Sequence, residues 1–476
     1  YSDRSAKPLR RIKAVWYGLF INGLILAWVN VAMLTVLEIY LGIDRPTAFL
    51  ILAALVVTTT ITVWIGGLRG VVYVDAYQFV LALGGAVVLA IWAVNAPQVG
   101  GLYGIREKLQ HAGALNFFPQ AGSSPANGSL VVGWGQLVAF LGLQWWASWY
   151  PGAEPGGGGY IAQRMLSTKH EGGALKSMLL FQFLHYAVRP WPWILVGLSC
   201  LILYPEIQSG GSGYVRAMRE VLPAGLGGLM LVGFGSAYMS TLSTHLNWGA
   251  SYLVNDWLGL AYPRVRSSLL LSRLLVVALG AIGLCGALVV DRVESVWLFL
   301  IECGAGTGSV LILRWFWWRV TAAAELVATI LPFLLFGFQQ VIHFQVEAGS
   351  ETGFFVFPTT YFITVTGTIL GWLLVVWLGP KPQLMSIESF DQRVRPMGWW
   401  PFNRVGRNRM LWILIGAWLV SAVSILGVLV GLGQLLVGDW MVGLVCAGIS
   451  GGGVVSLFLI DKRYGIFSEK EIQDTA

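Results

Sequence analysis

Hydroxyl, imidazole and amide side chains crowd residues 236–247, in the middle of a long apolar stretch. At the period of a helix, four of these positions share one stripe: Ala237, Ser240, Thr241 and Thr244. A stripe of neutral oxygens inside a membrane can replace the water around a small cation. This pattern favours an ion site and hence transport. Hydroxyls that bond back to their own helix are the structural alternative.

Two acidic residues fall in or beside apolar stretches, where an ionised carboxylate is costly unless it meets a partner, a cation or a cavity. Asp75 follows the glycine-rich segment 66–70, and an interfacial pair with Arg69 is the structural alternative to an ion-handling role. Glu302 lies deeper in its apolar stretch, and Arg189 is one candidate partner for it. Both acids are therefore candidates for contact with an ion or a substrate.

A histidine and an arginine share a helical face near a predicted proline kink. His185 and Arg189 are separated by one helical turn, and Pro190 follows. Upstream, the prolines and consecutive glycines of residues 151–159 predict a broken helix, which transporters use to expose backbone groups to substrate. Gln163 follows this break. The candidate substrate-binding residues, each with a structural clamp or cap as the alternative, are His185, Arg189, Glu302 and Gln163.

The composition indicates a membrane protein. The chain has 476 residues, of which 56% are hydrophobic and 11% are charged, and its apolar stretches are long enough to cross a bilayer. We therefore expect an all-α polytopic protein, because the short alternating segments of a β-barrel are absent. The net charge of +7 does not indicate nucleic-acid binding, since the basic residues lie in loops. No cofactor is expected, and the cysteines have no metal-ligand spacing.

Windows of about 20 apolar residues predict twelve membrane spans, approximately 15–37, 48–66, 71–95, 131–149, 177–203, 224–254, 268–290, 295–313, 322–343, 358–379, 410–436 and 440–460. With the N-terminal residues inside, 22 Lys and Arg lie in inner loops and 6 in outer loops. The positive-inside rule therefore predicts that both ends of the chain are cytoplasmic. The inner loop 380–409 is polar and basic and is expected to be a linker.

Two other function classes fit some of these features. An intramembrane histidine, His185 or His245, would suit an acyltransferase-like membrane enzyme, but neither has a recognisable nucleophile or metal partner. A sensor built on a transporter-like domain would carry a signalling domain, and the C-terminal residues show none. A transporter rather than an enzyme is the favoured interpretation.

Three stretches together resemble the sodium:solute symporter family, the relatives of sodium/glucose and sodium/proline symporters. They are residues 66–78, 160–164 and 239–247, the last with Asp256 beyond it. They occur in the family's order and separation, and the resemblance covers roughly residues 1–320. The stretch 145–159 looks like that of a bacterial branch, so a bacterial plasma membrane is expected, while the identity of the solute does not carry over.

The resemblance implies a fold and a division of the chain. The fold would be an inverted-repeat, leucine-transporter-like core of five plus five helices. Residues 1–320 would supply core helices 3–10, and residues 321–476 would supply peripheral helices and the linker. The family's extra first helix and core helices 1 and 2 would precede Tyr1, so an N-terminally truncated piece of a longer protein is expected.

The resemblance also implies a mechanism. The stripe falls on core helix 8, which in the family binds sodium through a backbone carbonyl at the position of Ala237 and hydroxyls at Ser240 and Thr241. Asp75 matches a family acid implicated in sodium handling, and His185 lies near a substrate-contacting position of core helix 7. The expected activity is sodium-coupled import of a small organic solute by alternating access, with core helix 1 completing the sodium site.

Overall fold

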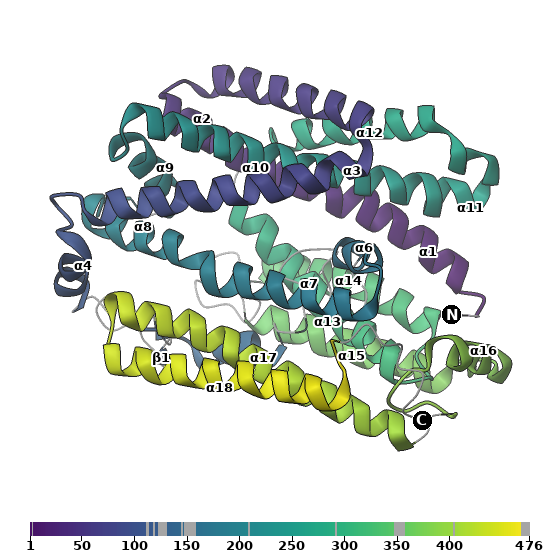
Figure 1. Cartoon of the computed structure of the whole chain (residues 1–476). Coiled ribbons are helices and arrows are strands. Elements are labelled where there is room, and N and C mark those ends of the chain that lie inside the picture. Colours follow the sequence, from purple (N-terminus) through teal and green to yellow (C-terminus); the bar gives the residue numbers. More distant parts are fainter. Residues whose placement is uncertain are drawn as a thin grey trace.

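The chain folds almost entirely into helices that run roughly side by side in the computed structural model (Figure 1). The structure describes residues 1–476 apart from 2, 111–113, 118–119, 122–130, 144–145, 147–158, 208–209, 291–292, 347–357, 403–404 and 468–476. For a second set the backbone alone is described: 66–76, 120–121, 131–132, 160, 163–164, 210, 267, 293–298, 343–346 and 405.

The helices of the first half are α1 (Ala6–Val15), η1 (Trp16–Ile21), α2 (Asn22–Leu41), α3 (Arg45–Val94), α4 (Gly101–Leu109), α5 (Trp134–Val138), η3 (Ala139–Leu143), α6 (Gly159–Leu166), α7 (Glu171–Phe183), η5 (Leu184–Val188), α8 (Pro190–Leu203) and α9 (Gly210–Glu220). Two short strands, β1 (Gln120–Ala121) and β2 (Val131–Val132), pair in parallel.

The helices of the second half are α10 (Ala224–Ser251), η6 (Tyr252–Leu258), α11 (Gly259–Ala261), η7 (Pro263–Ser267), α12 (Leu269–Gly286), α13 (Val293–Phe316), α14 (Ala322–Val346), α15 (Thr359–Leu378), α16 (Leu384–Val394), α17 (Val405–Val437) and α18 (Trp440–Tyr464).

Eleven helical stretches within the described residues are long and apolar enough to cross a membrane. They correspond to the predicted spans except for 131–149. In that stretch the described residues form a short helix, Trp134–Leu143, and the residues after it lie mostly outside the described set. Two spans, Arg45–Ile65 and Tyr77–Val94, belong to α3, whose helical backbone continues through the connection between them.

The first membrane stretch, Ala6–Leu41, is longer than predicted because α1, the π-helical η1 and α2 follow one another without a break. The helix ends at Gly42, whose φ of +66° is a left-handed conformation that glycine adopts without a steric penalty. The Gly42 N–H donates to the Glu38 carbonyl oxygen at 3.0 Å. Local sequence thus explains where this helix stops.

Two groups of helices bury separate cores. α2, α3, α10 and α12 share one core, which includes Leu52 and Leu242. α13, α14 and α15 share another, which includes Val310, Ala328 and Trp372. Figure 1 shows the first group along the top of the molecule and α17 beside α18 along the bottom. The candidate residues are therefore distributed over distinct packing units.

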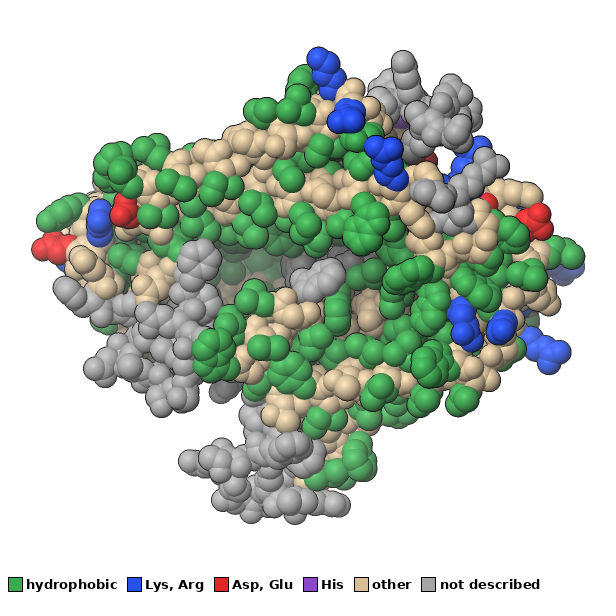
Figure 2. Space-filling view, turned by 90° about the horizontal axis from the view of Figure 1, so that it is seen from below, with side chains coloured by type: hydrophobic (Ala, Val, Ile, Leu, Met, Phe, Trp, Pro, Cys, Tyr) green, Lys and Arg blue, Asp and Glu red, His purple; other side chains and the backbone are tan. Residues whose placement is uncertain are grey.

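The outer surface suits a hydrocarbon environment. Hydrophobic side chains cover much of the face in Figure 2, and the acidic side chains that show there lie toward its ends. On α18, Phe458 and Leu459 point outward with 68% and 58% exposure. A contiguous exposed apolar surface of this kind is rare on water-soluble proteins and normal where lipid covers it.

The segment predicted as a linker, 380–409, contains a helix and is attached to the end of α13. The Arg407 guanidinium donates to both carboxylate oxygens of Asp391 on α16, at 2.5 and 3.2 Å. The Trp399 N–H donates to the Phe316 carbonyl oxygen at 2.7 Å. Figure 1 shows the N-terminal end on the same side of the molecule as α16.

Candidate functional site

The predicted hydroxyl stripe lies on α10, and Ala237, Ser240 and Thr241 are half-buried rather than sealed in the core. Thr241 Oγ1 donates to the Ala237 carbonyl oxygen at 3.0 Å, which brings two oxygens together one helical turn apart. Ser243 Oγ donates in the same way to the Ser240 carbonyl oxygen at 2.9 Å. Back-bonds of this kind are the structural alternative for these hydroxyls, although a hydroxyl that donates one keeps lone pairs that can coordinate a cation.

Two polar pairs join α10 to α2. His245 Nδ1 lies 2.6 Å from Asn22 Oδ1, and Asn22 Nδ2 donates to the His245 carbonyl oxygen at 2.9 Å. The Tyr238 hydroxyl donates to Asn30 Oδ1 at 2.6 Å. His245, Asn22 and Asn30 are fully buried. The two pairs form an antiparallel seam, because the later residue on α10 meets the earlier residue on α2.

This seam sets the rotation of α10. At about 100° per residue, Tyr238 and His245 lie roughly a quarter turn around the helix from Ala237 and Thr244. The centre of the hydroxyl stripe therefore lies to one side of the face that meets α2, and Thr241 lies at the edge of the stripe nearest that face. Asn22 and Asn30 had no place among the candidates from sequence. Two asparagines within one apolar span are polar groups that need partners. That is the sequence signal that could have marked Asn22 and Asn30 as contacts to another helix.

The seam also gives His245 a structural role. Its ring is sealed from solvent and bonded to Asn22, and it meets the Trp248 ring edge-on at 5.8 Å between centroids. A buried histidine with this role is poorly placed to act as the base of an acyltransferase, which requires access to its substrate.

His185 and Arg189 lie together, as their spacing predicts. His185 Nδ1 and Arg189 Nη1 are 3.2 Å apart. The imidazole stacks on Phe181 at 5.2 Å between centroids, and the guanidinium lies 4.4 Å from the centre of the Trp193 ring. The turn that carries His185 is π-helical, and Pro190 begins α8 directly after Arg189. A π-helical turn directly before Pro190 thus carries a cation and an imidazole on one half-buried face.

Glu302 has a different environment from the one predicted. No ion pair joins it to Arg189, although the structure describes both side chains. Instead Thr360 Oγ1 donates to Glu302 Oε1 at 3.2 Å, across the interface between α13 and α15. Its other oxygen has no hydrogen-bond partner in the described part of the chain. The structure therefore does not bring Glu302 into the His185–Arg189 pair.

Two candidate residues lie outside the described side chains. Asp75 belongs to the segment of α3 for which only the backbone is described, and Gln163 to the corresponding part of α6. Their roles remain the ones predicted from the sequence.

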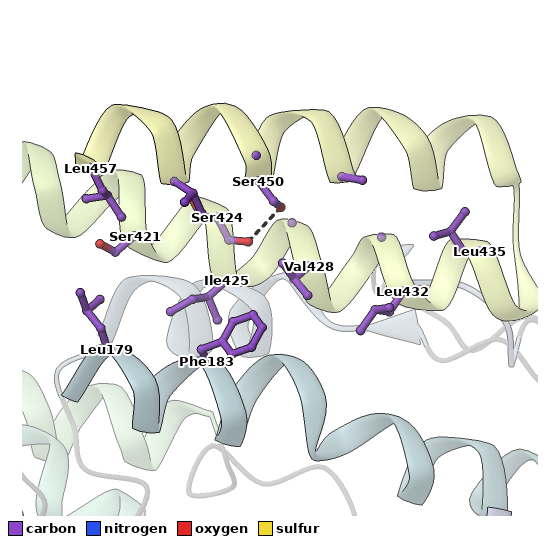
Figure 3. A pocket seen from close by; sticks show the side chains of 15 residues that line it. Leu179, Phe183, Ser421, Ser424, Ile425, Val428, Leu432, Leu435, Ser450 and Leu457 are labelled. Atoms are coloured by element: carbon purple, nitrogen blue, oxygen red, sulfur yellow. Dashed lines mark hydrogen bonds between the residues drawn. The ribbon is translucent and has the colours of Figure 1, made fainter. Parts of the chain in front are cut away.

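A cavity of about 440 Å³ opens between α7, α17 and α18 (Figure 3). Its walls are mainly apolar, and Phe183 and Ile425 project into it. The hydroxyls of Ser421, Ser424 and Ser450 donate to backbone carbonyls, at 2.7 to 3.0 Å. None of the candidate residues lines this cavity, and its surface suits hydrocarbon rather than a polar solute.

Comparison with known proteins connects these features to a family. The sequence pattern of the Sodium:solute symporter family matches residues 19–331, more than half of the chain. Sodium/glucose cotransporter 1 of Mus musculus is 25% identical over 360 residues, which cover 66% of this chain and 51% of that protein. Sodium/myo-inositol cotransporter 2 of Rattus norvegicus is 26% identical over 321 residues, which cover 60% and 46%. The chain thus spans about half the length of the curated relatives it matches.

The fold is similar to that of a solved transporter. A Na⁺-coupled sialic acid symporter in a substrate-bound outward-open state superposes with a TM-score of 0.55 at 20% sequence identity, covering 79% of this chain and 76% of the other. At this identity the likeness concerns the fold alone. The architecture is therefore the leucine-transporter-like one that the sequence resemblance implied.

Proposed function

Because the chain belongs to the sodium:solute symporter family, we propose that the full-length protein is a sodium-coupled transporter that imports a small organic solute by alternating access. The apolar spans and the fold support a role in the membrane. The observation that carries the proposal is the family match over residues 19–331, a range that includes the half-buried oxygen stripe on α10.

The proposed sodium ligands are the Ala237 carbonyl oxygen and the hydroxyls of Ser240 and Thr241, with Asp75 handling sodium nearby. Neutral oxygens at the depth of the membrane can replace a cation's hydration shell without burying a net negative charge. The ligands belong to a helix that the Asn22 seam holds in a fixed rotation, so the stripe is preorganised. Core helix 1 is expected to supply the opposite half of the site.

Coupling requires sodium to bind two states with different affinity, because equal binding would shift nothing. In the proposed cycle, sodium binding favours the outward-facing state and orders the solute pocket. Loss of sodium to a low-sodium cytoplasm then releases the solute. An inward-negative potential would add about 2.3 kcal/mol per charge per 100 mV. The inside location of both chain ends and a bacterial plasma membrane belong to the same proposal.

The proposed solute-binding group contains His185, Arg189 and Gln163. Arg189 supplies donors that suit a carboxylate or hydroxyl groups, and His185 can donate or accept. Both come from a half-buried face at a π-helical turn before Pro190, an irregularity of the kind at which transporters place substrate contacts. Glu302 lies in a different interface, beside Thr360.

The sodium assignment can be tested without knowledge of the solute. In the purified full-length protein, sodium binding is measured by titrating the tryptophan fluorescence with sodium against a choline background. Ser240→Ala and Thr241→Ala should each raise the half-saturating sodium concentration, by about tenfold if the lost ligand contributes about 1.4 kcal/mol. Ser243→Ala, on the same helix but off the stripe, is the matched control and should titrate as the wild type does.

Uptake into proteoliposomes provides the second arm. Glucose, myo-inositol and sialic acid form the first panel, because relatives are named for them. For a transported solute, the two stripe variants should need more sodium for the same uptake rate. Sodium dependence that is unchanged in both variants, in titration and in uptake, would contradict the assignment of the site to α10.

A further inference from the structure

α13, α14 and α15 pack against one another (Figure 1). Their shared interface contains a seam of buried polar side chains. The hydroxyl side chains of this seam are all at most 8% exposed: Thr307, Ser309, Thr360, Thr364 and Thr368. Most are satisfied locally. Thr368 Oγ1 donates to the Thr364 carbonyl oxygen at 2.6 Å, and Thr307 Oγ1 donates to Ala328 O at 2.7 Å. Most hydroxyls of this interface therefore have a hydrogen-bond partner within the protein.

Two acceptor oxygens in this seam have no hydrogen-bond partner among the described residues, Glu302 Oε2 and Gln339 Oε1. Glu302 is 6% exposed and Gln339 is 2% exposed. Thr360 donates to the other oxygen of Glu302 at 3.2 Å, and Gln339 Nε2 donates to Thr364 Oγ1 at 2.9 Å. Because Thr360 and Thr364 are one turn apart on α15, both unpaired acceptors border the same face of that helix.

No positive charge compensates Glu302 in the described part of the chain. Its titratable neighbours are the Cys303 thiol on α13 and the Tyr361 phenol on α15, and both are acids. The carboxylate of α14, Glu325, is engaged by Lys13 and by Arg314 of α13.

Two further charged groups belong to the elements around this seam. α2 also packs on α13. Its carboxylate, Glu38, pairs with Arg45 at 3.9 Å. Arg319, after α13, donates to the Val376 carbonyl oxygen at 3.3 Å. The cations near these helices therefore have other partners than Glu302.

We propose that Glu302 is a proton-binding site and is held as a neutral acid in the packed seam. An ionised carboxylate in hydrocarbon with a single neutral donor is far more costly than the protonated acid. The unpaired atom, Oε2, is the oxygen that takes the proton, since Oε1 already accepts from Thr360. When α13 separates from α15 and water reaches the carboxyl group, the proton is released.

The packing of α13 against α15 therefore depends on pH. A proton held in the packed state but lost from the open state makes packing weaker as pH rises. The ligand is a proton, not sodium, and the site is separate from the oxygen stripe on α10. An experiment that refutes proton binding at Glu302 would therefore leave the sodium site on α10 untested, and the reverse also holds.

The test measures the thermal unfolding midpoint of the full-length protein in detergent, from mildly acidic to alkaline pH at constant sodium. The wild type should lose stability as pH rises. Release of one proton on unfolding lowers the folding equilibrium constant by at most about tenfold per pH unit. Glu302→Gln, an uncharged isostere of the protonated acid, should lack this component. Glu388→Gln removes an exposed carboxylate on α16 and should keep the wild-type dependence.

Infrared spectroscopy keeps the test decisive if Glu302→Gln does not fold. The folded wild type at neutral pH should show the C=O stretching band of a protonated carboxyl group, and Glu302→Asp should shift that band. Identical carboxylic-acid bands in these two proteins would overturn the proposal. An unfolding midpoint that still falls with pH in Glu302→Gln would also overturn it. So would a difference in unfolding midpoint between wild type and variant that high sodium abolishes at fixed pH.

Discussion

Lys13 and Glu325 form a buried ion pair between α1 and the start of α14, although 312 residues separate them in the sequence. Arg314, near the end of α13, reaches the same carboxylate at 3.1 Å. Glu325 is 1% exposed, and the Tyr1 hydroxyl also donates to it. One carboxylate thus joins three helices at the end of the bundle where the N-terminal residues lie.

Glu325→Gln should destabilise the protein strongly, because it leaves Lys13 and Arg314 without their shared partner. Removal of one member of a buried ion pair typically costs about 3–5 kcal/mol. Lys13→Met should cost less, since Arg314 still pairs with the carboxylate. Thermal unfolding in detergent measures both. If Glu325→Gln were no more destabilising than Glu388→Gln on exposed α16, the pair would not be a structural clamp.

The Asn22–His245 pair should show strong energetic coupling. Asn22→Leu and His245→Leu each leave a buried polar group unpaired, with an expected cost of about 1–3 kcal/mol. The double variant should be less destabilised than the sum of the two, because both unpaired groups are removed together. A double-mutant cycle from unfolding measurements gives the coupling. Additive effects would mean that the seam does not fix α10 against α2.

Two glycines on α10 should respond to the same substitution in opposite directions. A Cβ added at Gly249 would meet Asn22 Nδ2 and lie 2.7 Å from the Gly18 carbonyl oxygen, whereas a Cβ at Gly235 meets nothing within 4 Å. Gly249→Ala should therefore cost about 1–3 kcal/mol through overpacking. Gly235→Ala should stabilise the helix by up to about 1 kcal/mol. Equal unfolding midpoints would contradict the close approach of α10 to η1 and α2.

The ion pair on α9 should contribute stability that is lost in acid. Arg216 Nε donates to Glu220 Oε1 at 2.9 Å, and this hydrogen bond lowers the pKa of Glu220. A depressed pKa in the folded state means that the stabilisation is complete above the ordinary glutamate pKa and disappears as pH falls through the folded value. The effect should be small and weaker at high salt, because the pair is exposed.

Unfolding midpoints of the wild type and Glu220→Gln, measured through the acid range at low and high salt, test this expectation. The variant should lack the acid-induced loss that belongs to this pair. Parallel acid profiles at low salt would show that the pair does not contribute.

Two variants of Thr241 separate loss of an oxygen ligand from loss of shape. Thr241→Ser keeps the hydroxyl and should bind sodium almost as the wild type does. Thr241→Val keeps the branched shape but removes the oxygen, so it should raise the half-saturating sodium concentration as Thr241→Ala does. Sodium titration of tryptophan fluorescence distinguishes them. A defect in Thr241→Ser equal to that in Thr241→Val would indicate packing rather than ligation.

The sequence by itself determined the membrane class, eleven of the spans and the helical face that carries Ala237, Ser240 and Thr241. Hydropathy and helical period depend only on neighbouring residues, so they can be read along the chain. The pairing of His185 with Arg189 has the same origin, because residues one turn apart on a helix are neighbours whatever surrounds them.

Only the tertiary structure decided which side chains meet across helices. Spacing says nothing about Asn22 meeting His245, or Lys13 meeting Glu325, because these partners are hundreds of residues apart and are chosen by the packing of whole helices. Arg189 was one candidate partner for Glu302 from the sequence, but Glu302 lies beside Thr360 instead. A buried acid needs a partner, but the fold decides whether that partner is a cation, a hydroxyl or a proton.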